Sequence, residues 1–295
     1  MITEHTDILI IGAGAAGMAA ALAAAQKGYP KILLVERSSK PGGILLQCAH
    51  KGFGRGYFGE DLTGMEYARR FQEMLDRSPV RVLCDTMVLK LGPDRSALLS
   101  GMNGLKKVCF ERCILASGCR ERTLQSLDVA GTRPAGIMTC GTAQKLLNID
   151  RLNVGDDILI LGTGDVGQIV ARDLTLAGRK VLAMIEKEDH PGGLKRNQKN
   201  CIEAFSIPVM LNTEITRICG PERISGVWVI HHDTGKEEYL PCSTLLTAIG
   251  MIPERELAEE CFSHTPLPDW LTLTGNCDYV HDIVDSITAE ALRLF

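Results

Sequence analysis

The chain has 295 residues, 45% of them hydrophobic and 23% charged, and a formal net charge of −4. This size and composition predict a folded globular protein with enough apolar residues for two domains. The negative net charge, without a run of Lys or Arg, argues against nucleic acid as a partner. The longest apolar stretches, such as residues 18–25, are too short to span a bilayer, and residues 1–7 lack the features of a secretory signal. We therefore expect a cytoplasmic protein without a membrane span.

Residues 1–35 predict a β-α-β unit. Residues 7–11 are an apolar, β-branched run, a glycine-rich turn follows, and residues 18–27 are an alanine-rich helix that Gly28 ends. Residues 31–35 are then a second buried strand. Two strands joined by a helix in this way predict a parallel sheet.

Two helices and a strand are predicted in the next part of the chain. Residues 60–76 have the apolar spacing of an amphipathic helix. A strand at 112–116 ends at Gly118, and residues 142–148 predict a short helix within an irregular connection.

The β-α-β unit returns 150 residues later, in register. A strand at 157–161, a glycine turn, a helix at 169–176 and a strand at 180–185 repeat the first unit. Eight residues of the first unit recur at a constant spacing of 150 residues. They are Gly12 and Gly162, Gly14 and Gly164, Gly17 and Gly167, Gly28 and Gly178, Glu36 and Glu186, Pro41 and Pro191, Gly42 and Gly192, and Gly43 and Gly193. One G-x-G-x-x-G is weak evidence, but two copies with the same acidic residue and Pro-Gly-Gly predict two bound nucleotides.

The last elements return to the first domain. A strand at 243–248 ends at Gly250, and a final strand from residue 271 reaches a turn at Gly275-Asn276. A helix is expected from about His281, with Asp278 as its candidate N-cap. We therefore expect a domain of residues 1–118 and 245–295, interrupted by a second domain of residues 119–244.

The fingerprint residues have physical roles in nucleotide binding. The first glycine permits a tight turn, the second lets the backbone approach a pyrophosphate, and the third allows the helix to pack closely on the strand. The helix N-terminus offers N–H groups and a positive dipole end to the phosphate. Glu36 and Glu186, each at the end of a second strand, can accept hydrogen bonds from an adenosine ribose.

With these motifs over nearly its whole length, the chain resembles the two-dinucleotide-binding-domain flavoproteins, the superfamily that includes thioredoxin reductase. Residues 42–54, 62–67, 136–145 and 274–285 are similar to a narrower group. That group comprises the FAD/NAD(P)-binding oxidoreductases encoded beside glycerol-3-phosphate or 2-hydroxyacid dehydrogenases, related to the alpha subunits of sarcosine and opine oxidases.

The resemblance implies an α/β fold with two Rossmann-like FAD/NAD(P)-binding domains, the second inserted in the first. It implies that the first copy holds FAD and the second holds a nicotinamide nucleotide. The FAD residues expected on this basis are Gly12, Gly14, Ala15, Ala16, Gly17, Glu36, Arg37, Gly42, Gly43, Ala116, Gly118, Gly275, Asn276 and His281. The NAD residues expected are Gly162, Gly164, Asp165, Val166, Gly167, Glu186 and Gly250.

The carboxylate of Glu186 bears on which nicotinamide nucleotide binds. A carboxylate at this place repels a 2′-phosphate, whereas NADPH-specific relatives tend to carry arginines there. Lys187 weakens this argument without reversing it. We expect NADH or NAD⁺ in preference to the phosphorylated form.

The turn Gly275-Asn276 departs from the superfamily, which usually has Gly-Asp at the flavin ribityl chain. Asn276 can still form a hydrogen bond there, but it carries no charge. His281, near the start of the following helix, is a candidate for contact with the flavin ring; the alternative is a partly exposed histidine in the first helical turn.

The sequence has eleven cysteines, but no two are spaced as C-x-x-C. Cys109 and Cys113 form a C-x-x-x-C within one predicted strand, which favours neither a zinc nor an iron–sulfur site, and we expect no metal. Cys48 and Cys140 lie near the places where disulfide reductases carry redox pairs, yet each lacks a resolving thiol, so a dithiol relay is not expected. Cys48 remains a candidate thiolate beside the flavin, with a packed thiol as the commoner alternative.

These observations predict an FAD-dependent oxidoreductase that passes hydride between NAD(H) and flavin. By resemblance, the electrons are exchanged with a partner flavoprotein dehydrogenase. A homo-oligomer and a hetero-oligomer both remain open. The alternatives are a stand-alone enzyme like thioredoxin or ferredoxin reductase, and a non-catalytic nucleotide-binding subunit.

Overall fold

The computed structural model describes residues 2–262 and 266–295 and divides into two compact units. Unit 1 consists of residues 1–120 and 252–295, and unit 2 of residues 121–251, so the second unit interrupts the first. The chain passes between them in two short strands, β9 (Cys119–Glu121) and β19 (Met251–Pro253), which pair with each other. Among the described residues, none of the helices combines the length and apolar character that a membrane crossing requires.

A seven-stranded sheet forms the centre of unit 1, in the order β5-β2-β1-β8-β7-β6, with β20 also paired to β8. The pairs β1–β2, β2–β5, β1–β8 and β8–β20 are parallel, whereas β6 to β8 form an antiparallel meander. The strands are β1 (Ile2–Ile11), β2 (Ile32–Val35), β5 (Arg81–Leu83), β6 (Thr86–Gly92), β7 (Ser96–Gly101), β8 (Gly104–Leu115) and β20 (Leu271–Leu273). Cys109 and Cys113 both lie in β8, as expected.

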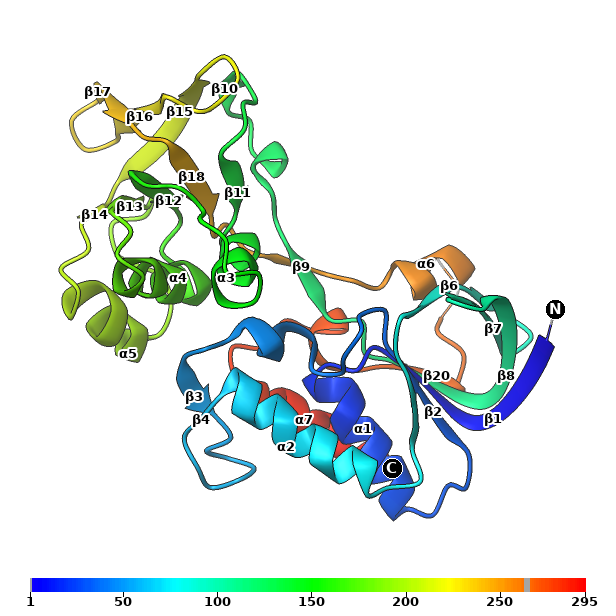
Figure 1. Cartoon of the computed structure of the whole chain (residues 1–295). Helices are drawn as coiled ribbons and strands as arrows, with labels where there is room; N and C mark the ends of the chain where they lie inside the picture. The colour runs from blue at the N-terminus through cyan, green and yellow to red at the C-terminus, as the bar shows by residue number, and fades with distance from the viewer. Residues whose placement is uncertain (1, 263–265) are drawn as a thin grey trace. The chain divides into compact units, whose positions relative to one another are not determined.

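Helices and a small hairpin complete unit 1 (Figure 1). The helices are α1 (Ala15–Gln26), α2 (Gly64–Asp76), α6 (Glu256–Phe262) and α7 (Val284–Leu292), with short helical turns at η1 (Gly43–Gln47) and η4 (Gly275–Cys277). The hairpin pairs β3 (Lys51–Phe53) with β4 (Leu62–Thr63).

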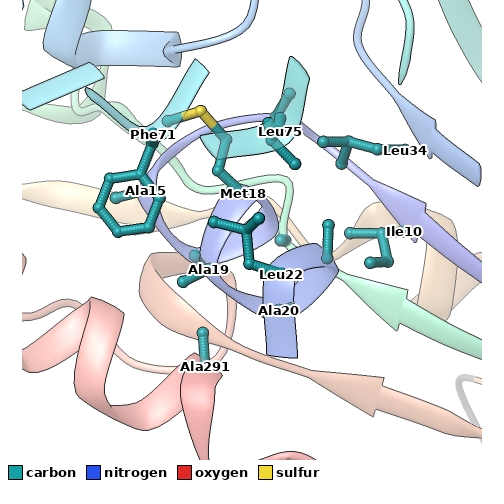
Figure 2. Close-up of a cluster of buried hydrophobic side chains, with 14 of the residues drawn as sticks. Ile10, Ala15, Met18, Ala19, Ala20, Leu22, Leu34, Phe71, Leu75 and Ala291 are labelled. Atoms are coloured by element: carbon teal, nitrogen blue, oxygen red, sulfur yellow. The ribbon is translucent and has the colours of Figure 1, made fainter. Parts of the chain in front are cut away.

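Helix α1 is buried nearly all round because its alanines let other elements approach closely. Its residues 15–24 are all buried, and it packs against β1, β2, α2 and α7. Figure 2 shows Met18 and Leu22 of this helix near Phe71 and Leu75 of α2, with Ala291 of α7 on the opposite side. This packing fixes the N-terminal end of α1 in the unit.

Unit 2 repeats the parallel arrangement and adds an antiparallel sheet. Its parallel sheet has the order β11-β18-β12-β13-β14, with helices α3 (Cys140–Asn148) and α4 (Asp165–Leu176). Its strands are β11 (Ile137–Thr139), β12 (Ile158–Leu161), β13 (Val181–Ile185), β14 (Val209–Met210) and β18 (Thr244–Thr247). The second sheet contains β10 (Ala130–Gly131), β15 (Thr213–Cys219), β16 (Gly226–His231) and β17 (Lys236–Pro241). Short helical segments lie at η2 (Leu124–Ser126), α5 (Lys195–Asn197) and η3 (Gln198–Glu203).

The expected α/β class with two Rossmann-like domains is confirmed, but two details differ. The expected boundary before residue 245 falls inside β18, which pairs in parallel with β11 and β12, so residues 245–251 belong to unit 2. The helix expected from about His281 begins at Val284, with Ile283 as its N-cap residue, and Asp278 does not cap it. Within the loop before α7, the backbone N–H of His281 donates to the Asn276 side chain rather than to a helical carbonyl.

A buried hydrogen bond connects α2 to α7 across the core of unit 1. The Tyr67 hydroxyl lies 2.7 Å from the Thr288 hydroxyl, and both residues are fully buried. Burial raises the pKa of the Tyr67 phenol, so this group stays neutral.

We expect Tyr67→Phe to lower the free energy of unfolding by about 1 kcal/mol, because the Thr288 hydroxyl loses its buried partner. Urea denaturation of Tyr67→Phe, Thr288→Val and the double variant should give a double loss smaller than the sum of the single losses. Tyr279→Phe is the matched control, since Tyr279 is 68% exposed. A loss no larger for Tyr67→Phe than for this control would contradict the prediction.

Candidate functional site

The glycine turn of unit 1 is required by the packing of its own backbone. Gly12 has φ +96°, and a Cβ there would lie 2.4 Å from the Ala116 carbonyl oxygen. A Cβ on Gly17 would lie 1.8 Å from the Gly12 carbonyl oxygen. Both positions therefore exclude any side chain, because the ends of β1 and β8 and the first turn of α1 are in direct contact.

Unit 2 reproduces this geometry. Gly162 has φ +97°, and a Cβ there would lie 2.3 Å from the Ala248 carbonyl oxygen, just beyond β18. A Cβ on Gly167 would lie 2.9 Å from the Ala248 Cβ. The sequence repeat at a spacing of 150 residues is thus a structural repeat, with Ala248 in the place of Ala116.

The middle glycines face open space. A Cβ on Gly14 would meet no heavy atom within 4 Å, and one on Gly164 would meet only the Ala248 oxygen, at 3.9 Å. Each is the N-cap residue of its helix, and neither α1 nor α4 has a side-chain cap there. Since the protein itself does not need a glycine at these two positions, the absent side chain fits the approach of a ligand to the helix N-terminus.

A glutamate closes each turn from the end of the second strand. The Glu36 carboxylate accepts hydrogen bonds from Ala13 N at 2.9 Å and Ser38 N at 2.8 Å. The Glu186 carboxylate accepts from Thr163 N at 3.1 Å and from the Thr163 hydroxyl at 2.6 Å. A carboxylate has about four acceptor positions, so each glutamate can hold its turn and still accept a ribose hydroxyl.

The Pro-Gly-Gly segments pack over the fingerprint turns. In unit 1, Gly42 N donates to Ala13 O at 2.7 Å, and a Cβ on Gly43 would lie 3.2 Å from the Gly14 Cα. Gly42 and Gly43 have φ of +129° and +53°, which glycine adopts without strain. A nucleotide over Gly14 would therefore meet this segment as well.

In unit 2 the same segment is held by side chains, of which sequence analysis identified Asp165 but not Thr163 or Gln168. Gly192 N donates to the Thr163 hydroxyl at 2.8 Å, and Gln168 Nε2 donates to both Thr163 O and Gly192 O. Asp165, in the first turn of α4, accepts from Leu194 N and Asn197 Nδ2. Its carboxylate is thus directed to residues 194–197, while the backbone N–H of Asp165 and Val166 stays at the helix start.

The last turn of unit 1 lies against the first turn of α1. A Cβ on Gly275 would lie 2.8 Å from the Ala16 Cβ. Asn276 is engaged by the protein, because its Oδ1 accepts from His281 N at 2.9 Å and its Nδ2 lies 3.6 Å from the Cys119 Sγ. His281 lies in the loop before α7, with Nε2 2.8 Å from Glu290 Oε2.

Glu290 also contacts this turn, and sequence analysis did not identify it. Its Oε1 accepts from Gly275 N and from the Thr274 hydroxyl, each at 2.8 Å. Burial alone would raise the pKa of the Glu290 carboxyl, but these hydrogen bonds and the nearby His281 imidazole hold that pKa below its usual range. A single glutamate within a helix gives no sequence signal for such a role.

Three further expected residues are Gly118, Gly250 and Arg37. Gly118 and Gly250 have φ of +80° and +101° and follow β8 and β18. Arg37 is largely exposed and lies 3.6 Å from the Glu254 carboxylate.

Cys48 and Cys140 lie near the places where disulfide reductases carry redox pairs, and both are buried in the structure. Cys48 is buried after η1, with its Sγ donating to Ile44 O. Cys140 is fully buried at the start of α3, where burial and the Glu121 carboxylate raise its pKa well above the usual value. All eleven cysteines are outside disulfides. In residues 2–262 and 266–295, no cluster of three or more His, Cys, Asp or Glu side chains could hold a metal ion.

The comparisons with known proteins agree with this geometry. Residues 6–265 match the family described as pyridine nucleotide-disulphide oxidoreductase. A thioredoxin reductase of Mycolicibacterium smegmatis is 29% identical over 87% of this chain and 80% of its own length. Sarcosine oxidase subunit alpha of Rhizobium meliloti is 28% identical over 86% of this chain, which spans only 25% of that subunit.

A solved structure shows the same fold. The thioredoxin reductase of T. acidophilum superposes with a TM-score of 0.78 over 98% of this chain and 96% of its own, at 18% sequence identity. Together with the match over most of the sequence, this confirms the expected superfamily. The chain belongs to the pyridine nucleotide-disulphide oxidoreductase family and is a flavin-dependent NAD(P)H oxidoreductase.

Proposed function

We propose that unit 1 holds FAD, that unit 2 holds NADH or NAD⁺, and that hydride passes between them while electrons are exchanged with a partner dehydrogenase. The observation that carries this proposal is the pair of matching turns in which an added Cβ on the first or third glycine would clash, whereas one on the middle glycine, Gly14 or Gly164, would not. Bound FAD supplies a ring that accepts or donates a hydride at one nitrogen. The residues of this chain bind and orient the two cofactors.

In unit 1, the N–H groups of Ala15 and Ala16 at the start of α1 would bind the FAD pyrophosphate. Glu36 would accept from the adenosine ribose, and Gly43 leaves room above Gly14. The Gly275 turn, packed against Ala16, would lie along the ribityl chain. The Asn276 side chain already accepts from His281 N and donates to Cys119, and it has one further N–H and one further acceptor position for FAD.

In unit 2, Asp165 N and Val166 N would bind the NAD pyrophosphate, and Glu186 would accept from the ribose. The Glu186 carboxylate is fixed by Thr163 from one side and by Glu188 N, at 3.2 Å, from the other. A 2′-phosphate would therefore meet a charge that cannot easily turn away. This supports NADH over NADPH.

The proposal of a partner dehydrogenase rests on two observations. The sequence contains no C-x-x-C, so the chain lacks the resolving thiol that a disulfide relay requires. One relative is, by its name, a subunit of a larger oxidase, and this chain spans a quarter of that subunit's length. We propose that the chain is the nicotinamide-reactive part of a complex of this kind.

The glycine geometry predicts that Gly14→Ala and Gly164→Ala will weaken binding without unfolding the protein. Since neither Cβ meets a protein atom within about 3.9 Å, we expect thermal unfolding of the ligand-free protein to change little. We expect FAD affinity to fall about tenfold or more in Gly14→Ala, and NADH affinity likewise in Gly164→Ala, because the pyrophosphate must move away from the helix N–H groups. Fluorescence titration measures both.

Gly162→Ala is the matched control for unit 2. Its Cβ would lie 2.3 Å from the Ala248 oxygen, so it should lower the stability of the ligand-free protein. Equal nucleotide affinity in Gly164→Ala and the unchanged protein would show that unit 2 does not bind the nucleotide at this turn.

Anaerobic stopped-flow absorbance tests hydride transfer and the choice of nucleotide. We expect NADH to bleach the flavin band faster than NADPH at equal concentration. In Glu186→Gln this preference should fall about tenfold, because one charge that opposes the 2′-phosphate is removed. The exposed carboxylate of Glu203 provides the control, and Glu203→Gln should keep the preference.

The other functions predict different results. Bound FAD that neither nucleotide reduces would favour a scaffold or sensor subunit. Rapid NADH-dependent reduction of thioredoxin or a disulfide dye would favour a stand-alone reductase, and full turnover of a small substrate by the chain alone, with no partner co-purifying, would overturn the proposed complex.

A further inference from the structure

Glu290 connects three segments of unit 1 that are separate in the sequence. Its Oε1 accepts hydrogen bonds from the Thr274 hydroxyl at the end of β20 and from Gly275 N in the following turn. Its Oε2 lies 2.8 Å from the His281 imidazole in the loop before α7. The Glu290 carboxylate thus holds the Thr274–Gly275 end of this loop by two hydrogen bonds. At the other end it lies beside the His281 imidazole, in a contact without hydrogen-bond geometry that becomes an ion pair when the imidazole is protonated.

The loop is also closed on itself. Asn276 Oδ1 accepts from His281 N at 2.9 Å. The contacts therefore form a ring that runs from Gly275 to Asn276, across to His281, on to Glu290 and back to Gly275. Removing the carboxylate opens the ring at two places and leaves Gly275 N and the Thr274 hydroxyl without their acceptor.

This ring lies at the end of α1 where the fingerprint turn is. A Cβ on Gly275 would lie 2.8 Å from the Ala16 Cβ and 3.2 Å from Ile287 Cγ2. The Gly275 turn is therefore confined between the first turns of α1 and α7. A change in its position would alter the first turn of α1, which begins one residue after Gly14.

The residues around the Glu290 carboxylate differ in their exposure to solvent. Thr274 is fully buried, and the side chains of His281 and Glu290 are 14% and 35% exposed. Both side chains border a hollow of about 460 Å³, whose lining residues are His281, Asp285, Ser286, Ala289, Glu290 and Arg293. Because hydrogen bonds to a charged acceptor are stronger than neutral ones, and more so when partly buried, the carboxylate has a large effect on the loop.

We propose that Glu290 is a positioning residue of the flavin site, which fixes the Thr274–Asn276 turn and His281 against α7 so that their backbone groups are presented to FAD. This inference rests on the proposed binding of FAD by unit 1. Glu290 does not touch the flavin in this arrangement; it acts through the turn and through His281.

The test compares Glu290→Ala with Glu290→Gln. The alanine variant removes the acceptor, so we expect FAD affinity of the full-length protein to fall about tenfold or more. The glutamine variant keeps an acceptor oxygen for Gly275 N and the Thr274 hydroxyl, so its FAD affinity should stay within about threefold of the unchanged protein. FAD titration of the flavin-free protein measures both, and Glu259→Ala, an exposed residue of α6 in the same unit, is the control.

The reduction potential of the bound flavin gives an independent reading. Glu290→Gln removes a negative charge near the site while keeping the geometry, so the midpoint potential should rise relative to the unchanged protein. A residue that only stabilises the fold would leave this potential unchanged in the glutamine variant. Should Glu290→Ala not yield folded protein, Thr274→Val removes one donor of the ring and is expected to lower FAD affinity by an intermediate amount.

The outcomes separate this inference from the proposed function. If the unchanged protein binds no FAD, the proposed function fails. If the unchanged protein binds FAD and Glu290→Ala or Thr274→Val binds it equally well, or if glutamine gives no more rescue than alanine, the positioning role is overturned.

Discussion

One close approach of backbone to backbone organises each unit. The carbonyl of Ala116 in unit 1, and of Ala248 in unit 2, occupies the space where a side chain on the first fingerprint glycine would stand. This contact fixes the end of the central strand against the neighbouring parallel strand, and the third glycine then brings the helix down on the same point. Because these contacts use the first and third glycines, the middle glycine is the one whose missing side chain the protein's own packing does not require.

The two copies keep this geometry but support it differently. In unit 1 the Pro-Gly-Gly segment is joined to the turn mainly by the backbone bond from Gly42 N to Ala13 O. In unit 2 the equivalent segment is held by the Thr163 hydroxyl, Gln168 and Asp165. The side chain of Thr163 also donates to Glu186, so in unit 2 one threonine connects the glutamate carboxylate to the Pro-Gly-Gly segment. A change at Thr163 would therefore disturb both partners, whereas Ala13 contributes only its backbone.

The two fingerprint turns offer backbone N–H groups and carboxylates as binding groups. Backbone N–H groups at two helix ends and two carboxylates are sufficient to bind and orient dinucleotides. The eleven cysteines are free and are distributed over β-strands, helices and loops. The electrons then need an acceptor or donor outside the chain, and this is why the proposed function includes a partner.

The sequence by itself determined the two β-α-β units, their glycine turns and their acidic residues, because these depend on local backbone conformation and on a spacing that repeats. It also predicted helix α2 and the strands that end in Gly118 and Gly250. Only the tertiary structure decided the end of unit 2, since β18 is assigned by its pairing with β11 and β12. The start of α7 at Val284 was likewise seen only in the structure, where the preceding loop contains a side-chain bond from His281 N to Asn276. Glu290 joins residues 15 and 16 positions earlier in the chain to its own helix, and such a contact arises from the packing of α7 on α1 rather than from any motif.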